Sequence, residues 1–507
     1  MGNLSSSSNQ KKSLPIDTTF KLPSNIPTWP QGGGFGSGII DLGGLKVSQI
    51  STFNKIWTTL EGGQEDLGAT FFEPTQIPQG FFSLGHYSQP NNKPLFGWVL
   101  VAKDESNGAL KSPIDYTLVW SSKSQKIKQD KDGYIWLPIA PNGYSPLGHI
   151  VTTTPEKPSL DRIQCVRSDL TDQCEINSWI WGKDKKIDEK GFNVHCVRPS
   201  NRGTQAPSVL VGTFLAHVGE VTNSPLPISC LKNSNFMSFS SMPNLPQVKA
   251  LAQGYSPIMY LHPNEKFQPC SIKWYFTNGA LLYKKEEEAN PIEIDPLGSN
   301  LPQGGSNDGS YWIDLPKDKA NRERVKKGTL KVGLIDNISL GKIGEHIGDW
   351  EHVTLRISNF NGELRSVYFS QHSNGQWVDA SEVEFQSGNK SVAYSSLNGH
   401  AIYSKAGLVL QGVSEIGIKN ETKKSEMVVD FGDGFEIVSG DYLGDEVVEP
   451  SWLNFFRQWG PKITYDLGEE LKKLDKIVPG LKLPNELLGE EGPTGPKLKR
   501  NWIGDEV

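Results

Sequence analysis

The runs LFGWVLVA at Leu95–Ala102 and DYTLVWS at Asp115–Ser121 are short and rich in β-branched and aromatic residues. Turn-forming residues lie on both sides of them, for example Pro-Asn-Asn at 90–92 and Asp-Lys-Asp-Gly at 130–133. Short runs of this composition between turn signals are typical of β-strands. Because similar runs recur along most of the chain, the sequence predicts an all-β fold.

Composition supports the same fold class and excludes several functions. The 507 residues include 52 glycines and 33 prolines. These are more helix-breaking residues than helical bundles or coiled coils tolerate. There are 51 basic and 57 acidic side chains, a net charge of −6, so the basic footprint of a nucleic-acid-binding protein is missing. The chain contains no apolar run of 18 residues, and we expect no transmembrane helix.

The pattern divides the chain into four parts. Residues 1–19 are predicted to be a disordered tail, and residues 441–507 a short helix at Asp466–Val478 followed by an extended strap. Between them lie two β-rich domains, 20–220 and 247–440, separated by a polar link rich in Pro, Ser and Asn. We expect the first to be β-prism-like and the second a β-sandwich. Further predicted strands include Asp161–Val166, Ser208–Phe214, Ile272–Thr277, Thr329–Leu334 and Leu364–Gln371.

The N-terminus reads Met-Gly-Asn-Leu-Ser-Ser, which matches the myristoylation pattern with Gly2 as the acceptor. The alternative to a myristoylation site is that this segment is simply a flexible polar tail. No charged region followed by an apolar one marks a secretory signal. We therefore expect a cytoplasmic protein that Gly2 holds peripherally on membranes, although one acyl chain binds membranes only marginally without a second contact.

The densest group of chemically active side chains is GEHIGDWEHV at 344–353. On a strand, Asp349 and Glu351 would share one face, with His346 reaching in from the preceding turn and Asp336 from an upstream loop. Three carboxylates and one imidazole suit a hard divalent cation, Ca²⁺ or Mg²⁺ rather than Zn²⁺. The alternative is that these side chains only bond loop amides and neighbouring basic groups.

Three other histidines are candidates for acid or base chemistry. His352 lies within the same segment, and His372 and His400 each follow a predicted strand. Loops at the strand ends of a sandwich cluster at its two ends, so His372 and His400 can converge on the Asp349 site. Each of them alone is more often a hydrogen-bonded structural residue. No G-x-S-x-G elbow or cysteine–histidine arrangement indicates nucleophilic catalysis.

Several segments resemble the plant members of the vacuolar protein sorting-associated protein 62 family. The resemblance spans about residues 20–507 and rests on WPQG at 29–32, FFSLGHY at 81–87, GDWEH at 348–352, SQHS at 370–373 and GPTGP at 492–496. The resemblance implies a link, by name, to delivery of proteins to the vacuole.

A shorter segment, His346 to Val353, is similar to the G-H-R-H-D-W-E-H-V region of necrosis- and ethylene-inducing peptide-like cytolysins. That resemblance implies a cation held by His346, Asp349, Glu351 and Asp336 at the membrane-facing end of a β-sandwich. Ile347 and Gly348 stand where the cytolysin motif has Arg and His. The N-terminal block also resembles β-prism domains of membrane-associated trafficking proteins.

We therefore expect a peripheral membrane or lipid-associated binding protein, whose divalent cation recognises a phosphate or sugar headgroup. Two alternatives stay open. The first is a metal-assisted hydrolase or lyase of specialised metabolism, with His352, His372 or His400 as acid or base. The second is a non-catalytic scaffold in which the whole cluster is structural.

Overall fold

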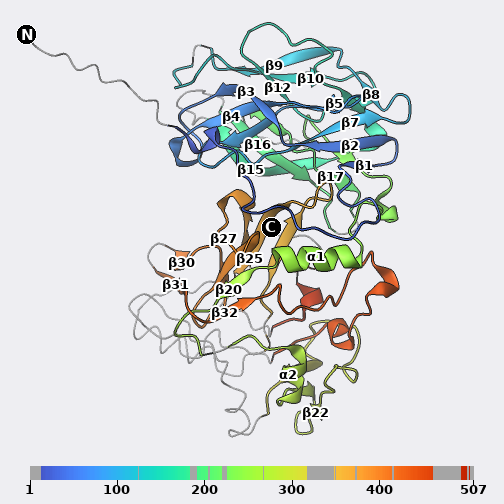
Figure 1. Ribbon diagram of the computed structural model, residues 1–507, viewed down its shortest axis with the longest axis vertical. Helices are drawn as coiled ribbons and strands as arrows, with labels where there is room; N and C mark the ends of the chain where they lie inside the picture. The colour runs from blue at the N-terminus through green and yellow to red at the C-terminus, as the bar shows by residue number, and fades with distance from the viewer. Residues whose placement is uncertain are drawn as a thin grey trace, which may run out of the picture. The chain divides into compact units, whose positions relative to one another are not determined.

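The computed structural model describes residues 13–123, 125–182, 191–203, 206–219, 225–266, 268–316, 348, 350–371, 374–413, 416–460, 493–499 and 502. These residues form many small β-sheets, with α-helices only at α1 (Leu245–Tyr255) and α2 (Ile272–Thr277) (Figure 1). The predicted all-β fold is confirmed. Neither of these helices has the length and apolar character needed to cross a bilayer. The helix predicted at Asp466–Val478 and the strand predicted at Thr329–Leu334 lie outside the described residues.

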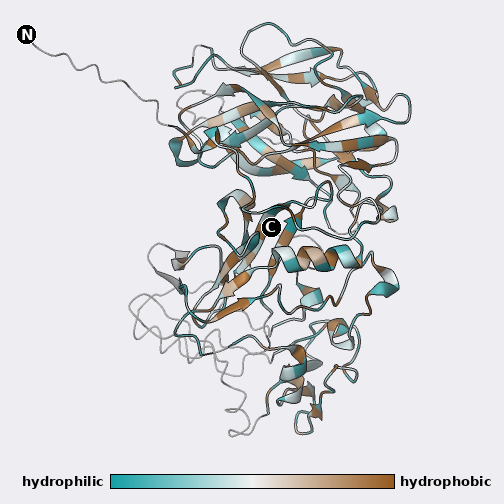
Figure 2. Cartoon of the chain, in the orientation of Figure 1, coloured by the Kyte–Doolittle hydropathy of each residue, from teal (hydrophilic) through white to brown (hydrophobic). Residues whose placement is uncertain are grey.

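The chain divides into two compact units. Unit 1 comprises Met1–Leu22, Gly33–Met242 and Asn359–Asn361, and unit 2 comprises Pro23–Gly32, Pro243–Ser358 and Gly362–Val507. In both units apolar residues are interspersed with polar ones along the strands, as expected for sheets that bury one face (Figure 2).

Unit 1 contains three equivalent three-stranded antiparallel sheets, which we call the tryptophan sheets. Each of them carries one tryptophan of a set spaced 63 and 61 residues apart: Trp57, Trp120 and Trp181. Their strand orders are β3-β4-β6, β9-β10-β12 and β15-β16-β18. The nine strands are β3 (Phe53–Thr58), β4 (Ala69–Pro74), β6 (Tyr87–Pro90), β9 (Asp115–Ser121), β10 (Tyr134–Ile139), β12 (Ile150–Thr152), β15 (Cys174–Gly182), β16 (Phe192–Pro199) and β18 (Phe214–Val218).

The first strand of each tryptophan sheet has a β-bulge directly before its tryptophan. The bulged residues are Ile56, Val119 and Ile180, where the register of each pair shifts. The three indole rings contact one another, with centroids 5.7–6.1 Å apart. A bulge increases the local twist and redirects a side chain. The repeated bulge therefore directs each tryptophan to a centre that the three sheets share.

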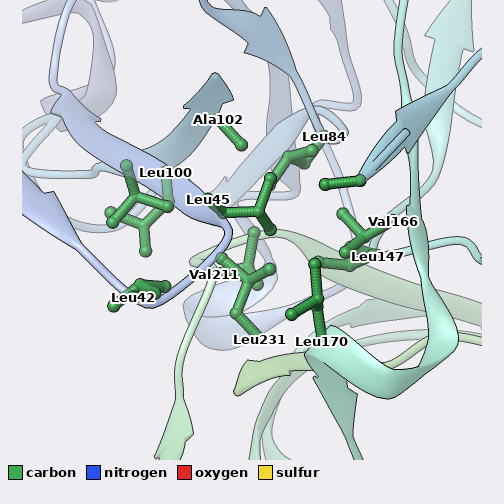
Figure 3. Close-up of a cluster of buried hydrophobic side chains, with 12 residues drawn as sticks. Leu42, Leu45, Leu84, Leu100, Ala102, Leu147, Val166, Leu170, Val211 and Leu231 are labelled. Carbon is green, nitrogen blue, oxygen red and sulfur yellow. The ribbon is translucent and has the colours of Figure 1, made fainter. Parts of the chain in front are cut away.

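A second set of three sheets repeats with the same period. Their strand orders are β2-β7-β5, with β1 added at one edge, β8-β13-β11 and β14-β19-β17. Buried aliphatic side chains from all three form one core, which includes Leu84, Leu147 and Val211 at equivalent positions (Figure 3). The strands are β1 (Ile39–Asp41), β2 (Leu45–Ile50), β5 (Phe82–Ser83), β7 (Val99–Asp104), β8 (Leu110–Lys111), β11 (Tyr144–Ser145), β13 (Cys165–Arg167), β14 (Thr171–Asp172), β17 (Ser208–Val209) and β19 (Cys230–Lys232).

The three repeats meet at equivalent tripeptides, Leu84-Gly85-His86, Leu147-Gly148-His149 and Val211-Gly212-Thr213. A Cβ on Gly148 would lie 2.6 Å from Cβ of Thr213, and a Cβ on Gly85 would lie 2.9 Å from Cα of Gly148, so only glycine fits. The backbone N–H of His86 donates to the carbonyl of His149 at 2.9 Å. The threefold internal repeat therefore converges on two buried histidines and a threonine.

Three strand predictions in unit 1 need correction. The strand predicted at Leu95–Ala102 begins only at Val99, where β7 starts. The strand predicted at Ser208–Phe214 is two strands, β17 and β18, because Gly212 between them has φ +84° and cannot continue an extended strand. The strand predicted at Asp161–Val166 begins only at Cys165. The predicted strand Asp115–Ser121 is confirmed as β9.

In unit 2 the described residues form three sheets and one two-stranded ribbon. The central sheet has the order β27-β28-β20-β32, with β29 paired to β28, and its β20–β28 pair is parallel. The other sheets are β24-β25-β26 and β22-β21-β23, and the ribbon is β30-β31. The strands are β20 (Ile258–Tyr260), β21 (Leu281–Lys284), β22 (Ile292–Glu293), β23 (Tyr311–Asp314), β24 (Val353–Ile357), β25 (Leu364–Gln371), β26 (Asn374–Asp379), β27 (Phe385–Gln386), β28 (Lys390–Ser395), β29 (Ile402–Tyr403), β30 (Gly407–Val413), β31 (Ile416–Thr422) and β32 (Val428–Asp430).

The strand predicted at Ile272–Thr277 is wrong, since this segment is the helix α2. The Ser271 hydroxyl caps the helix by accepting from the backbone N–H of Trp274 at 3.1 Å. The helix buries the adjacent residues Tyr275 and Phe276 together, whereas a strand would point them to opposite faces. The cap and this core contact outweigh the strand preference of the aromatic residues.

Candidate functional site

The segment before β24 carries the described part of the predicted cation site. The backbone N–H of His352 donates to Oγ of Ser370 at 3.1 Å, and the Ser370 hydroxyl donates to Oε2 of Glu351 at 2.5 Å. Ser370 is buried on β25, and its own N–H donates to the carbonyl of His352. Because Ser370 belongs to the sheet, this chain of bonds fixes the Glu351 carboxylate at the end of the β24–β25 pair.

Two tyrosines interact with the Glu351–His352 segment. The His352 imidazole stacks on Tyr368 of β25, with ring centroids 5.6 Å apart and an angle of 18°. Burial raises the pKa of Tyr403 on β29 to about 12, and the negative charge of Glu351 adds to this shift. Tyr403 therefore stays a neutral phenol near the Glu351 carboxylate.

A second carboxylate–histidine pair lies in the loops that follow β20 and β28. The Glu265 side chain is only 1% exposed, and its Oε2 lies 3.3 Å from Nε2 of His400. Backbone N–H groups of Lys266 and Asn398 donate to the two Glu265 oxygens, each at 2.8 Å. His262 is buried in the same loop, with Nε2 3.8 Å from Oε1 of Glu421 on β31.

The loop that carries His400 has an unusual backbone. Asn398 and His400 have φ values of 63° and 53°, in the left-handed region that residues other than glycine seldom adopt. The Glu265 carboxylate holds this loop through the Asn398 N–H. Strain of this kind persists only where the surroundings fix it, and it is common at functional sites.

The structure places only some of the predicted residues. It joins the Glu351 carboxylate and the backbone of the adjacent His352 to Ser370, and it pairs His400 with Glu265. Asp336, His346, Asp349, His372 and Gly2 lie outside the described residues. Since β24 begins at Val353, the strand alternation used to place Glu351 does not reach it. Among the residues that the structure does describe, no three His, Cys, Asp or Glu side chains are grouped so that they could hold a metal ion.

The sequence analysis missed His262, Glu265 and Glu421. The available signal was the tetrapeptide His-Pro-Asn-Glu at 262–265, which directly follows the buried apolar run 258–261. Polar residues that end a buried strand are natural candidates for a site, because loops at strand ends carry function.

Replacing Glu265 with alanine is expected to lower the free energy of unfolding of unit 2 by about 2–3 kcal/mol, because two backbone N–H groups would lose their acceptor. Glu265→Gln keeps an acceptor oxygen and should cost less. Urea denaturation of the full chain measures the difference, with Glu426→Ala as an exposed control in the same unit. Equal stability of Glu265→Ala and the wild type would contradict the structural role of this carboxylate.

Comparisons with known proteins give one family and one solved structure. The family model described as vacuolar protein sorting-associated protein 62 matches residues 16–332 and 328–506. No curated protein matches the chain. The solved structure is GNIP1Aa from Chromobacterium piscinae, with 20% sequence identity over 38% of this chain and 38% of that chain; its TM-score of 0.32 is too low to indicate a shared fold. Because the family model covers nearly the whole sequence, the chain belongs to the vacuolar protein sorting-associated protein 62 family.

Proposed function

We propose that the protein is a peripheral, lipid-associated binding protein related to vacuolar sorting, and that it recognises a phosphate-bearing headgroup through a divalent cation. Membership of the vacuolar protein sorting-associated protein 62 family supports the link to vacuolar sorting. The observation that carries the headgroup site is the Glu351 carboxylate, which Ser370 fixes at the end of a sheet. Asp336, His346 and Asp349 are its proposed partners.

A cation at this place would join the protein to an anionic ligand. Ca²⁺ and Mg²⁺ prefer oxygen ligands and keep coordination positions for water or phosphate when few carboxylates bind them. A carboxylate that a hydroxyl already orients loses little freedom when it binds a cation, which favours affinity. An acyl chain on Gly2 would supply the second membrane contact that a single weak site needs.

Flotation of the full chain on vesicles tests this proposal. We expect the protein to float with vesicles that contain phosphatidylserine in the presence of Ca²⁺ or Mg²⁺, and much less in EDTA. Asp349→Ala and Glu351→Ala should each weaken cation-dependent binding by about tenfold or more, since loss of even a ligand's hydrogen-bond partner commonly costs that much. Glu426→Ala, which removes an exposed carboxylate elsewhere in unit 2, should float like the wild type.

Protein made with and without N-myristoylation separates the contribution of Gly2 from that of the cation. Flotation that does not change with EDTA, with Asp349→Ala or with Glu351→Ala would contradict a cation-bridged site. Flotation that depends on the acyl chain alone would leave only the lipid anchor.

A further inference from the structure

Unit 1 buries two cysteines in one small cluster, Cys174 at the start of β15 and Cys230 at the start of β19. Both are free thiols, and they are 6% and 1% exposed. The same cluster contains Leu215 and Ile228, so its other side chains are apolar. The two cysteines are 56 positions apart in the sequence. The fold therefore brings together two thiols that no local pattern connects.

Strand pairing directs both cysteine side chains to one face. β14 and β19 are antiparallel, with Asp172 opposite Cys230, and residues that lie opposite each other share a face. Cys174 follows Asp172 by two positions, so the alternation of extended backbone returns its side chain to that face. Sγ of Cys174 lies 3.1 Å from the carbonyl oxygen of Ile228, two residues before Cys230. The Cys174 sulfur is therefore beside the segment that carries Cys230.

The two thiols also interact with each other, and this makes them chemically unequal. A hydrogen bond with Cys230 lowers the pKa of Cys174, against the opposite effect of burial. The hydrogen bond with Cys174 and burial raise the pKa of Cys230, and the negative charge of Asp172 adds to that rise. Cys174 is therefore the more acidic thiol of the pair. Since the thiolate is the reactive form of cysteine, Cys174 is the one that reacts first.

We infer that Cys174 and Cys230 are a redox modification site, at which hydrogen peroxide converts the two thiols into a reversible disulfide. Thiols that are this deeply buried favour a small oxidant over a bulky disulfide reagent. The Cys174 thiolate attacks one peroxide oxygen and the O–O bond breaks, which gives a sulfenic acid and hydroxide. The Cys230 sulfur then displaces the hydroxyl group from the Cys174 sulfur, and this group leaves as water with the Cys230 proton. In total, two thiols and one hydrogen peroxide give one disulfide and two water molecules.

The disulfide joins two different sheets of unit 1. β15 belongs to the third tryptophan sheet, β15-β16-β18, whereas β19 belongs to the sheet β14-β19-β17. The loop that the bond closes contains β15, β16, β17 and β18. A cross-link that closes a long loop restricts the unfolded chain and stabilises the folded one. Oxidation is therefore expected to raise the urea midpoint of unit 1 by about 1 M. This inference is independent of the proposed function, which uses neither cysteine.

Peptide mapping of the full chain tests this inference. The folded protein is treated with hydrogen peroxide, the remaining thiols are blocked with N-ethylmaleimide, and tryptic peptides are identified by mass spectrometry without reduction. Trypsin places the two cysteines in separate peptides, 168–183 and 203–232, and Cys165, Cys196 and Cys270 each in another peptide. We expect peptides 168–183 and 203–232 to be linked in monomeric protein, and dithiothreitol to separate them.

Serine variants test the separate roles of the two thiols. In Cys230→Ser the sulfenic acid on Cys174 has no thiol to resolve it, so dimedone should label peptide 168–183. In Cys174→Ser we expect dimedone to leave Cys230 unlabelled, because its thiol is the less acidic one. Cys165→Ser removes another buried thiol of unit 1 and should form the linked peptides as the wild type does. Only the wild type and Cys165→Ser should gain urea resistance on oxidation.

The wild-type peptide map decides the inference even if a serine variant does not fold. Recovery of peptides 168–183 and 203–232 as separate, blocked species after peroxide treatment would overturn it. A link that joins Cys174 to another cysteine, or that forms only in urea, would overturn it as well. A link between the two peptides without a rise in the urea midpoint would show that the bond does not stabilise unit 1.

Discussion

Replacing Trp181 with alanine is expected to lower the free energy of unfolding of unit 1 by about 3–5 kcal/mol, the usual cost of removing a large aromatic side chain from a core. Trp181 is fully buried and contacts both Trp57 and Trp120. Its indole N–H also donates to the carbonyl of Glu61 at 2.9 Å. Urea denaturation followed by circular dichroism measures the loss.

The control for this variant lies on the same strand. Trp179 is 39% exposed, and its indole donates to the side chain of Asn193. Trp179→Ala should cost less than about 1 kcal/mol, as surface substitutions generally do. The internal repeat adds a stricter test: Trp57→Ala should destabilise unit 1 about as much as Trp181→Ala. A small effect of either substitution would contradict a core shared by the three tryptophan sheets.

Lowering the pH from 7 to 5 is expected to destabilise unit 1 by about 4 kcal/mol through His86 and His149. Burial, together with the positive charge of Arg162, lowers the pKa of His86 to about 3. Burial also lowers the pKa of His149 to about 4. Both histidines have a pKa near 6.5 in the unfolded chain. Below pH 6.5 the unfolded state therefore binds protons that the folded state does not bind, and this lowers the free energy of unfolding. Their contribution is intact above pH 6.5 and is lost as the pH falls toward these folded values.

Asparagine variants isolate the two histidines from other titrating groups. Nδ1 of His86 accepts from the N–H of Val151 at 3.1 Å, and Nδ1 of His149 lies 3.2 Å from the Phe214 carbonyl. An asparagine can place its oxygen or its amide nitrogen at the corresponding position, but it does not titrate. The double variant His86→Asn/His149→Asn should therefore lose about 4 kcal/mol less than the wild type between pH 7 and pH 5. The remaining loss is expected from His195 and His217, whose pKa values burial also lowers. A pH dependence as steep as that of the wild type would show that other groups cause it.

Some strands of unit 1, such as β9, could be predicted from local pattern, but the internal repeat needed a comparison of the chain with itself. Asp115–Ser121 was identified because aromatic and β-branched residues follow a turn. The equivalent tryptophan strands differ in most other residues, and the period is preserved at few positions, among them Trp57, Trp120 and Trp181 and the later Gly85, Gly148 and Gly212. The three repeats share the contact of their tryptophans at one common centre. Only a few positions in each repeat determine that contact.

The site could be predicted only in part. The acidic and histidine-rich segment before β24 indicated Glu351, but Ser370, which holds its carboxylate, is nineteen residues away, and the SQHS segment at 370–373 does not mark it as the partner. His400 was identified as a strand-end histidine, whereas its partner Glu265 is 135 residues earlier in the chain. Sequence spacing gives the chemistry of one segment, but pairing between distant loops depends on the fold.

The threefold repeat of unit 1 has a consequence for assembly. One repeat folded alone would leave its tryptophan in water, so three separate copies would have to meet before that side chain was buried. In this chain the three copies are consecutive, and their meeting is an intramolecular closure whose entropic cost grows only slowly with the length of the connecting segments. Unit 1 is in this sense a tethered trimer, and its folding is independent of protein concentration.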